Sequence, residues 1–198
     1  MNLRFVIELQ AGGVGSGCHG SNCGRKALTD KQRQALDLVP KHHLKGVQDK
    51  FIKVVKIGDI HHMGYAGTAM YLADIANNDK IHPGKVGKDS EILVTHSTSP
   101  HDLLHEVGHH VWYTQLNDKQ RENWINAPVA VRGKTYTLHG NQSSAVEHFA
   151  EAYAHALRGT SAAPERISRE RNEKYKFYKP SVIDSAERVV KNIKKLVL

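Results

Sequence analysis

A five-residue segment, His105-Glu106-Val107-Gly108-His109, constrains this chain more than any other part of its sequence. Residues four apart in an α-helix lie about 40° apart around the axis and one turn apart along it, so both imidazoles can reach one metal ion. Upstream, Ser99 can cap a helix, Pro100 suits its first turn, and Asp102 favours its positive end. We therefore predict a helix from Ser99 to about residue 116, with the two histidines on one face.

The other side chains of this predicted helix separate by face. The side opposite the histidines is mostly apolar and should anchor the core; it carries Leu103, Leu104, Val107, Val111 and Thr114. Gly108 lies on the histidine side, where its bare backbone would permit close approach of a metal or substrate, at a helix-propensity cost of about 1 kcal/mol. Trp112 on the same side argues against the alternative of a surface helix with solvated imidazoles. We expect His101 at most to support His105, and His110, about 140° from His105, to be structural.

A catalytic zinc needs a third protein ligand, with one position left for water. In the metzincin pattern, position 112 would be Gly and position 115 would be the third His. This chain has Trp112 and Gln115 instead, which excludes that class. The third ligand must therefore come from another element.

A second predicted helix, opened by Ser143 or Ser144 and ending at residue 159, offers that ligand. Its candidate donors are Glu147, His148, Glu151 and His155. The two glutamates lie one turn apart, and the alanines beside them indicate that another element packs closely there, for which the HExxH helix is the natural partner. An alternative for Glu147 is a capping box with Ser144, in which its carboxylate would bend back to the start of the helix.

The two halves together, HEVGHH and the EHFAEAYA some forty residues later, resemble the zincin metallopeptidases, most closely the lethal-factor-like group. The resemblance spans about residues 101–157. It implies a Zn²⁺ ion on His105, His109 and Glu147, and hydrolysis of a protein or peptide substrate with Glu106 as the general base. It also implies that Glu151 supports a ligating histidine through a hydrogen bond.

The same resemblance assigns an oxyanion-stabilising tyrosine about seven residues before the ligand glutamate. That position is Gly140 in this chain. Tyr136 is the nearest upstream tyrosine and takes the catalytic role in our prediction, with His139 as the second candidate. The resemblance further implies that substrate pairs with an exposed strand, either residues 68–74 or residues 91–95.

The order of the predicted elements favours an α+β fold. Strand-prone segments precede the two motif helices, as expected for a zincin-like domain with a small antiparallel or mixed sheet, then the HExxH helix, then the helix of the glutamate ligand. The other expected elements are helices at 30–39 and 118–126 and strands near 51–55, 68–74 and 91–95.

Composition divides the chain into three parts. Residues 1–27 form a predicted flexible Gly-rich leader, residues 28–163 the metallopeptidase domain, and residues 164–198 a charged, helical C-terminal segment. Cys18 and Cys23 lie in the leader with His19 between them, an incomplete set for a tetrahedral metal. The leader resembles Gly-rich linkers of phage head-associated polypeptides, which implies association with a virion; a cytoplasmic location is the alternative.

Other functions compete with the metallopeptidase. The net charge of +8 allows a virion-associated structural protein or a nucleic-acid-binding protein, in which the zinc ion only stabilises the fold. The alternating charges near the C-terminus, however, favour a solvated surface over a nucleic-acid-binding surface. A hydrolase of non-peptide amides or cell-wall peptides would use the same ligands. No stretch approaches the roughly 18 apolar residues of a membrane span, and the start lacks a signal-peptide core, so we expect neither membrane insertion nor export.

Overall fold

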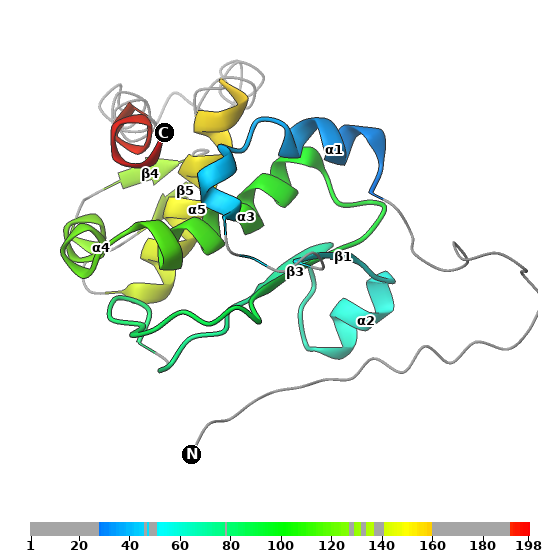
Figure 1. Ribbon diagram of the computed structural model, residues 1–198, viewed down its shortest axis with the longest axis horizontal. Helices are drawn as coiled ribbons and strands as arrows, with labels where there is room; N and C mark the ends of the chain where they lie inside the picture. Colours follow the sequence, from blue (N-terminus) through cyan, green and yellow to red (C-terminus); the bar gives the residue numbers. More distant parts are fainter. Residues whose placement is uncertain are drawn as a thin grey trace, which may run out of the picture.

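The computed structural model describes residues 28–45, 47, 51–77, 79–126, 129–131, 134–136, 141–159 and 191–198, without the side chains of 129–136. It has the predicted α+β class (Figure 1). Its elements are α1 (Asp30–Leu36), η1 (Lys41–Leu44), β1 (Ile52–Val54), α2 (Ile57–His62), β2 (Ala69–Leu72), β3 (Glu91–Val94), α3 (Pro100–Gln115), α4 (Asp118–Ile125), β4 (Val129–Val131), β5 (Lys134–Tyr136) and α5 (Gln142–Arg158). Residues 191–197 are also helical.

A three-stranded mixed sheet comes before the two long helices. Its order is β1-β3-β2, with β1 parallel and β2 antiparallel to the central β3. The continuous apolar run of β3 fits this central position, and Ile92, Leu93 and Val94 are all buried. Residues 91–95 are therefore excluded as the exposed strand, whereas β2, within the predicted 68–74 segment, lies at an edge of the sheet and contacts α3.

The motif helix α3 begins as predicted. The Ser99 side chain accepts a hydrogen bond from the backbone N–H of Asp102, and Pro100 occupies the first turn. The helix ends at Gln115, one residue earlier than expected. Its predicted core face is confirmed at Leu103, Leu104, Val107 and Val111, which have no exposed surface, but is wrong at Thr114, which is exposed.

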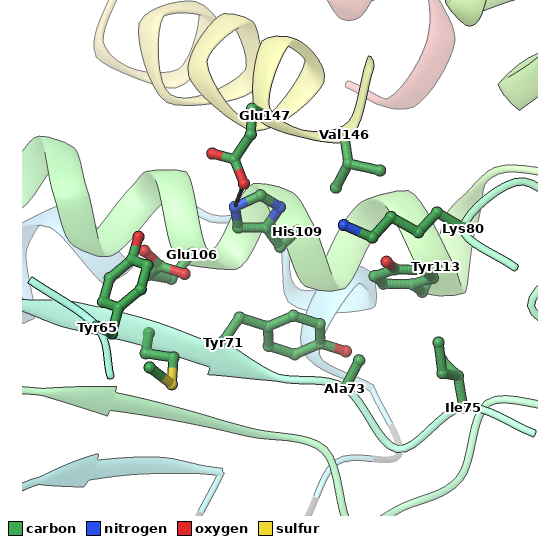
Figure 2. Close-up of a pocket in the computed structure, with 11 residues that line it drawn as sticks. Tyr65, Tyr71, Ala73, Ile75, Lys80, Glu106, His109, Tyr113, Val146 and Glu147 are labelled. Atoms are coloured by element: carbon green, nitrogen blue, oxygen red, sulfur yellow. Dashed lines mark ion pairs between the residues drawn. The ribbon is translucent and has the colours of Figure 1, made fainter. Parts of the chain in front are cut away.

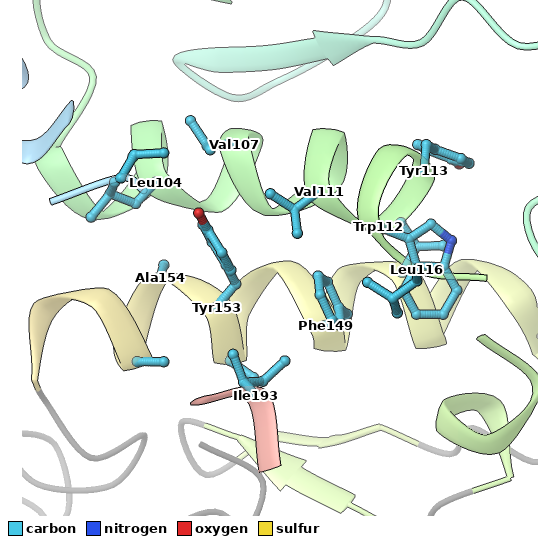
Figure 3. Close-up of a cluster of buried hydrophobic side chains, with 14 of the residues drawn as sticks. Leu104, Val107, Val111, Trp112, Tyr113, Leu116, Phe149, Tyr153, Ala154 and Ile193 are labelled. Atoms are coloured by element: carbon cyan, nitrogen blue, oxygen red, sulfur yellow. The ribbon is translucent and has the colours of Figure 1, made fainter. Parts of the chain in front are cut away.

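The closest approach to Gly108 is made by α5, and this corrects the prediction of a metal or substrate there. A Cβ added to Gly108 would lie 2.7 Å from Cα and 3.0 Å from the carbonyl oxygen of Ala150. The two helices lie against each other along their length (Figure 3). Near the C-terminal end of α3, Trp112 packs edge-on against Phe149 of α5 with ring centroids 5.3 Å apart. The missing side chain thus lets the two helices, and the polar groups they carry, come together.

Helix α5 begins slightly earlier than predicted, at Gln142. Asn141 is its N-cap and accepts from the backbone N–H of Ser144, so Ser144 lies within the first turn and does not cap the helix. The proposed capping box of Ser144 with Glu147 is therefore wrong. The helix ends at Gly159, whose φ of 64° is the left-handed conformation that glycine adopts easily.

The end of the chain also contributes to the core. Ile193 is fully buried and lies on the side of α5 facing away from α3, close to Tyr153 (Figure 3). His43 joins these parts, since its Nδ1 lies 2.7 Å from the Tyr153 hydroxyl and its Nε2 lies 2.8 Å from the carbonyl oxygen of Val197. Within the described ranges, no helix combines the length and apolarity that a bilayer crossing requires.

Candidate metal centre

Helices α3 and α5 bring His105, His109 and Glu147 together. One potential ligand atom from each lies within 4.8 Å of the others. Nε2 of His105 is 3.2 Å from Oε2 of Glu147. Nε2 of His109 is 3.6 Å from Oε1 of Glu147, the pair joined by the dashed line in Figure 2. Two donor atoms bound tetrahedrally to zinc at ordinary distances are separated by about 3.4 Å. The donor set and its spacing therefore fit one metal ion.

Glu151, one turn further along α5, contacts His105 at the ring nitrogen that does not face Glu147. Its Oε2 lies 3.2 Å from Nδ1 of His105 and 3.0 Å from Nε2 of His101, and its Oε1 lies 3.4 Å from Nε2 of His155. When His105 donates its Nδ1–H to Glu151, the lone pair of the imidazole is on Nε2, which faces Glu147. Such a hydrogen bond fixes both the tautomer and the ring orientation of a metal-ligating histidine.

His101, Glu151 and His155 form a second buried group with ligand-like spacing. A guanidinium can only donate, and Nη1 of Arg158 lies 3.3 Å from Nδ1 of His101. Nδ1 of His101 is therefore the acceptor, and its Nε2 carries the proton that it donates to Glu151. A metal would need a lone pair at that same Nε2. We interpret this group as hydrogen-bonded support for His105.

The electrostatics of the cluster favour a positive charge beside the glutamates. Burial alone would lower the pKa of His105, but hydrogen bonds to Glu147 and Glu151 outweigh it and raise the pKa to about 10. Burial, reinforced by the charge of His105, lowers the pKa of His109 to about 3. Burial would raise the pKa of Glu147, yet its hydrogen bond to His105 keeps that pKa below the usual value. Burial would also raise the pKa of Glu151, but its hydrogen bonds, first that to His101, lower it.

Glu106 lies beside the metal-ligand group and lines a cavity of about 380 Å³ together with His109 and Glu147. Its side chain is buried, and burial raises its pKa to about 7, although the charge of His105 opposes this shift. A carboxylate with this pKa can accept and release a proton near neutral pH, as a general base must.

The structure adds cavity residues that the sequence analysis did not single out. Tyr65, on the loop before β2, lies at the Glu106 end of the cavity, and Lys80 and Tyr113 lie at the other end (Figure 2). Tyr71 of β2 forms part of the wall between them. Tyr113 lies four residues after His109 on α3, so helical spacing could have placed it on the ligand side. No helical or strand spacing links Tyr65, Tyr71 or Lys80 to the motif, so only the folded chain identifies them.

Other predicted residues have different outcomes. Tyr136 ends β5, but its side chain is outside what the structure describes, and His139 lies outside the described residues. His110 is buried, with its Nδ1 3.2 Å from the Tyr71 hydroxyl, in keeping with a structural role. His148 is buried against the Trp124 ring and is not part of the metal-ligand group.

Comparison with known proteins gives no further guide. No protein-family model matches the chain, and neither the curated proteins nor the solved structures yield a match.

Proposed function

We propose that this protein is a zinc-dependent metallopeptidase of the zincin type, resembling the lethal-factor-like group. One observation carries the proposal: His105, His109 and Glu147 converge from two helices, and Glu106 lines the same cavity as two of them. Structural zinc sites are closed by four protein ligands, whereas catalytic sites keep three and leave one position open. Three donors at the edge of a cavity correspond to the catalytic arrangement.

The chain's own residues supply the remaining chemistry. When bound, a zinc ion lowers the pKa of its bound water toward 7 and polarises the substrate carbonyl. Glu106 then takes the proton of the attacking water and delivers it to the leaving amine, a role suited to its raised pKa. Glu151 holds the imidazole of His105 in place through its Nδ1–H.

Strand β2 is the proposed docking element for an extended peptide. It lies at the edge of the sheet, and Met70 and Tyr71 line the cavity beside Glu106. A peptide that adds to this edge gains main-chain hydrogen bonds that do not depend on its side chains. We propose that the substrate binds along β2 and that its scissile bond then lies next to His109.

The proposed function is tested by zinc content combined with cleavage of an unbiased peptide library, with products identified by mass spectrometry. We expect one zinc ion per chain and cleavage that stops when zinc is chelated and returns when it is restored. If the protein binds one zinc ion per chain but cleaves no peptide, the result would instead favour the alternative in which zinc has only a structural role. Cleavage confined to cell-wall peptides or non-peptide amides would change the proposed substrate class, but the proposed roles of the site residues would stay the same.

Two alanine substitutions on α5 should have different effects on zinc. Glu147→Ala removes a ligand, so stoichiometric zinc and activity should be lost together. Glu151→Ala removes no ligand but takes away the carboxylate that supports His105 and also contacts His101, so zinc affinity should fall about 10- to 100-fold with residual turnover at saturating metal. Zinc titration and turnover measure both. Loss of zinc in Glu151→Ala with retention in Glu147→Ala would exchange the two assignments.

A further inference from the structure

The cavity has an acidic group at one end and a basic group at the other. Glu106 and Tyr65 lie at one end, and the ammonium group of Lys80 lies at the other, beyond His109 (Figure 2). The metal-ligand group lies between them. A substrate whose reacting carbonyl sits at the ligands therefore extends a neighbouring group toward Lys80.

Hydrogen bonds from two helices hold the backbone of Lys80. Its N–H donates to Oε1 of Gln142 on α5 at 3.1 Å, and its carbonyl accepts from Nε1 of Trp112 on α3 at 2.7 Å. The next carbonyl, that of Ile81, accepts from the buried Nε of Arg121 at 2.6 Å. The two helices that carry the metal ligands thus also fix the position of this lysine.

The charge of Lys80 is available to a ligand. Its Nζ lies 3.0 Å from the hydroxyl of Ser143, a neutral partner. In the part of the chain that the structure describes, no carboxylate lies within ion-pair distance of this Nζ. The neighbouring Asp79 uses its Oδ1 to accept from the backbone N–H groups of Ile81 and His82 and from Nε2 of Gln142.

The surroundings of Lys80 suit a short side chain that ends in an anion. Ile75 and Val146 give this end of the cavity apolar walls that can pack against methylene groups. The Tyr113 ring lies at the same end of the cavity as Lys80, and burial raises the pKa of its phenol to about 12, so its hydroxyl remains a donor at neutral pH. The carboxylate of Glu147 also lines the cavity, but a metal cation on Glu147 would offset its repulsion of an anion.

We propose that Lys80 binds a carboxylate of the substrate next to the scissile bond, either an acidic side chain or the free C-terminus of the peptide. This inference rests on the proposed peptidase function and specifies the class of substrate, namely peptides with a carboxylate next to the scissile bond. An ammonium–carboxylate contact is a charge-assisted hydrogen bond, and loss of one costs about 10- to 100-fold in binding.

The test compares the wild type with Lys80→Met, Lys80→Glu and the control Lys88→Met, which changes an exposed lysine outside the cavity. One cleaved peptide is varied with Glu, Gln or Lys at each position beside the scissile bond, and with a free or amidated C-terminus close to it. We expect kcat/KM to favour one carboxylate about 10- to 100-fold in the wild type and in Lys88→Met. The preference should disappear in Lys80→Met and shift toward Lys in Lys80→Glu.

The preferred peptide identifies the source of the carboxylate: preference for Glu indicates a side chain, and preference for the free over the amidated end indicates the C-terminus. An equal loss on every peptide in Lys80→Met would overturn the proposal, because Lys80 would then act in a step common to all substrates. The absence of any charge preference in the wild type would also overturn it.

A binding measurement separates this proposal from the proposed function. Calorimetry with the zinc-loaded Glu106→Gln protein measures the affinity for each of the same peptides in the absence of turnover. The carboxylate peptide should bind at least about 10-fold more tightly than its neutral counterpart, and Lys80→Met should abolish that difference. If the wild type cleaves no peptide, the peptidase function fails, yet this measurement still decides whether Lys80 recognises a carboxylate.

Discussion

Replacement of Glu106 by Gln should reduce peptide cleavage by about 10²- to 10⁴-fold while the protein still binds one zinc ion. The amide has the size of the carboxylate but cannot take a proton from the attacking water. Glu106 is buried beside the cavity and is not among the three proposed ligands, so the metal should stay in place. Turnover at saturating substrate and zinc content by atomic absorption measure the two effects.

Glu122→Gln is the matched control for this experiment. Glu122 lies on α4, its side chain is half exposed, and it does not line the cavity. The same chemical change there should leave both cleavage and zinc binding unaltered. Near-normal turnover in Glu106→Gln would show that another group accepts the proton, and loss of zinc would show that Glu106 is needed to hold the metal.

Gly108→Ala should destabilise the fold by about 2 kcal/mol and weaken zinc binding at the same time. The new methyl group would lie 2.7 Å from Cα of Ala150, a backbone atom that cannot move without shifting α5. Overpacking of this kind costs roughly 1–3 kcal/mol, and the better helix propensity of alanine returns only about 1 kcal/mol. Because α5 carries Glu147, separation of the helices should also pull this ligand away from the histidines.

Gly58→Ala provides the control for this substitution. Gly58 also lies in a helix, α2, and a Cβ added there has no atom within 4 Å beyond its chain neighbours and the backbone of its own helix. That variant should keep or slightly raise the melting temperature, whereas Gly108→Ala should lower it by roughly 4–8 °C. Equal melting temperatures for Gly108→Ala and the wild type would mean that the helix interface adjusts freely and does not fix the metal-ligand group.

Local signals in the sequence determined several elements correctly. Thr29 and Gln32 predict a capping box at the start of α1, and the structure shows both of its hydrogen bonds, although the helix ends at Leu36 and not at residue 39. The start of α3 at Ser99 and the end of α5 at Gly159 were predicted from the same kind of short-range chemistry. Such signals are readable because the residues that interact lie within about one helical turn of one another.

The sequence also predicts that the two histidines of the candidate site lie together, because helical periodicity alone puts His105 and His109 on one face. Their convergence with Glu147 depends on how α3 and α5 pack. The small residues Gly108 and Ala150 allow that close packing, but the sequence did not reveal that they face each other.

Only the tertiary structure decided the rest of the site. Helix α2 was not predicted, and the position of β3 in the centre of the sheet could not be read from its apolar run alone. Lys80 has no recognisable motif, and its place in the cavity depends on hydrogen bonds to Trp112 and Gln142, which lie 32 and 62 residues away in sequence. The sequence by itself therefore determined helix ends and the ligand-bearing faces, where the interactions are local. Tertiary packing decided how closely the two helices approach and which loop completes the cavity, because those contacts join residues distant in sequence.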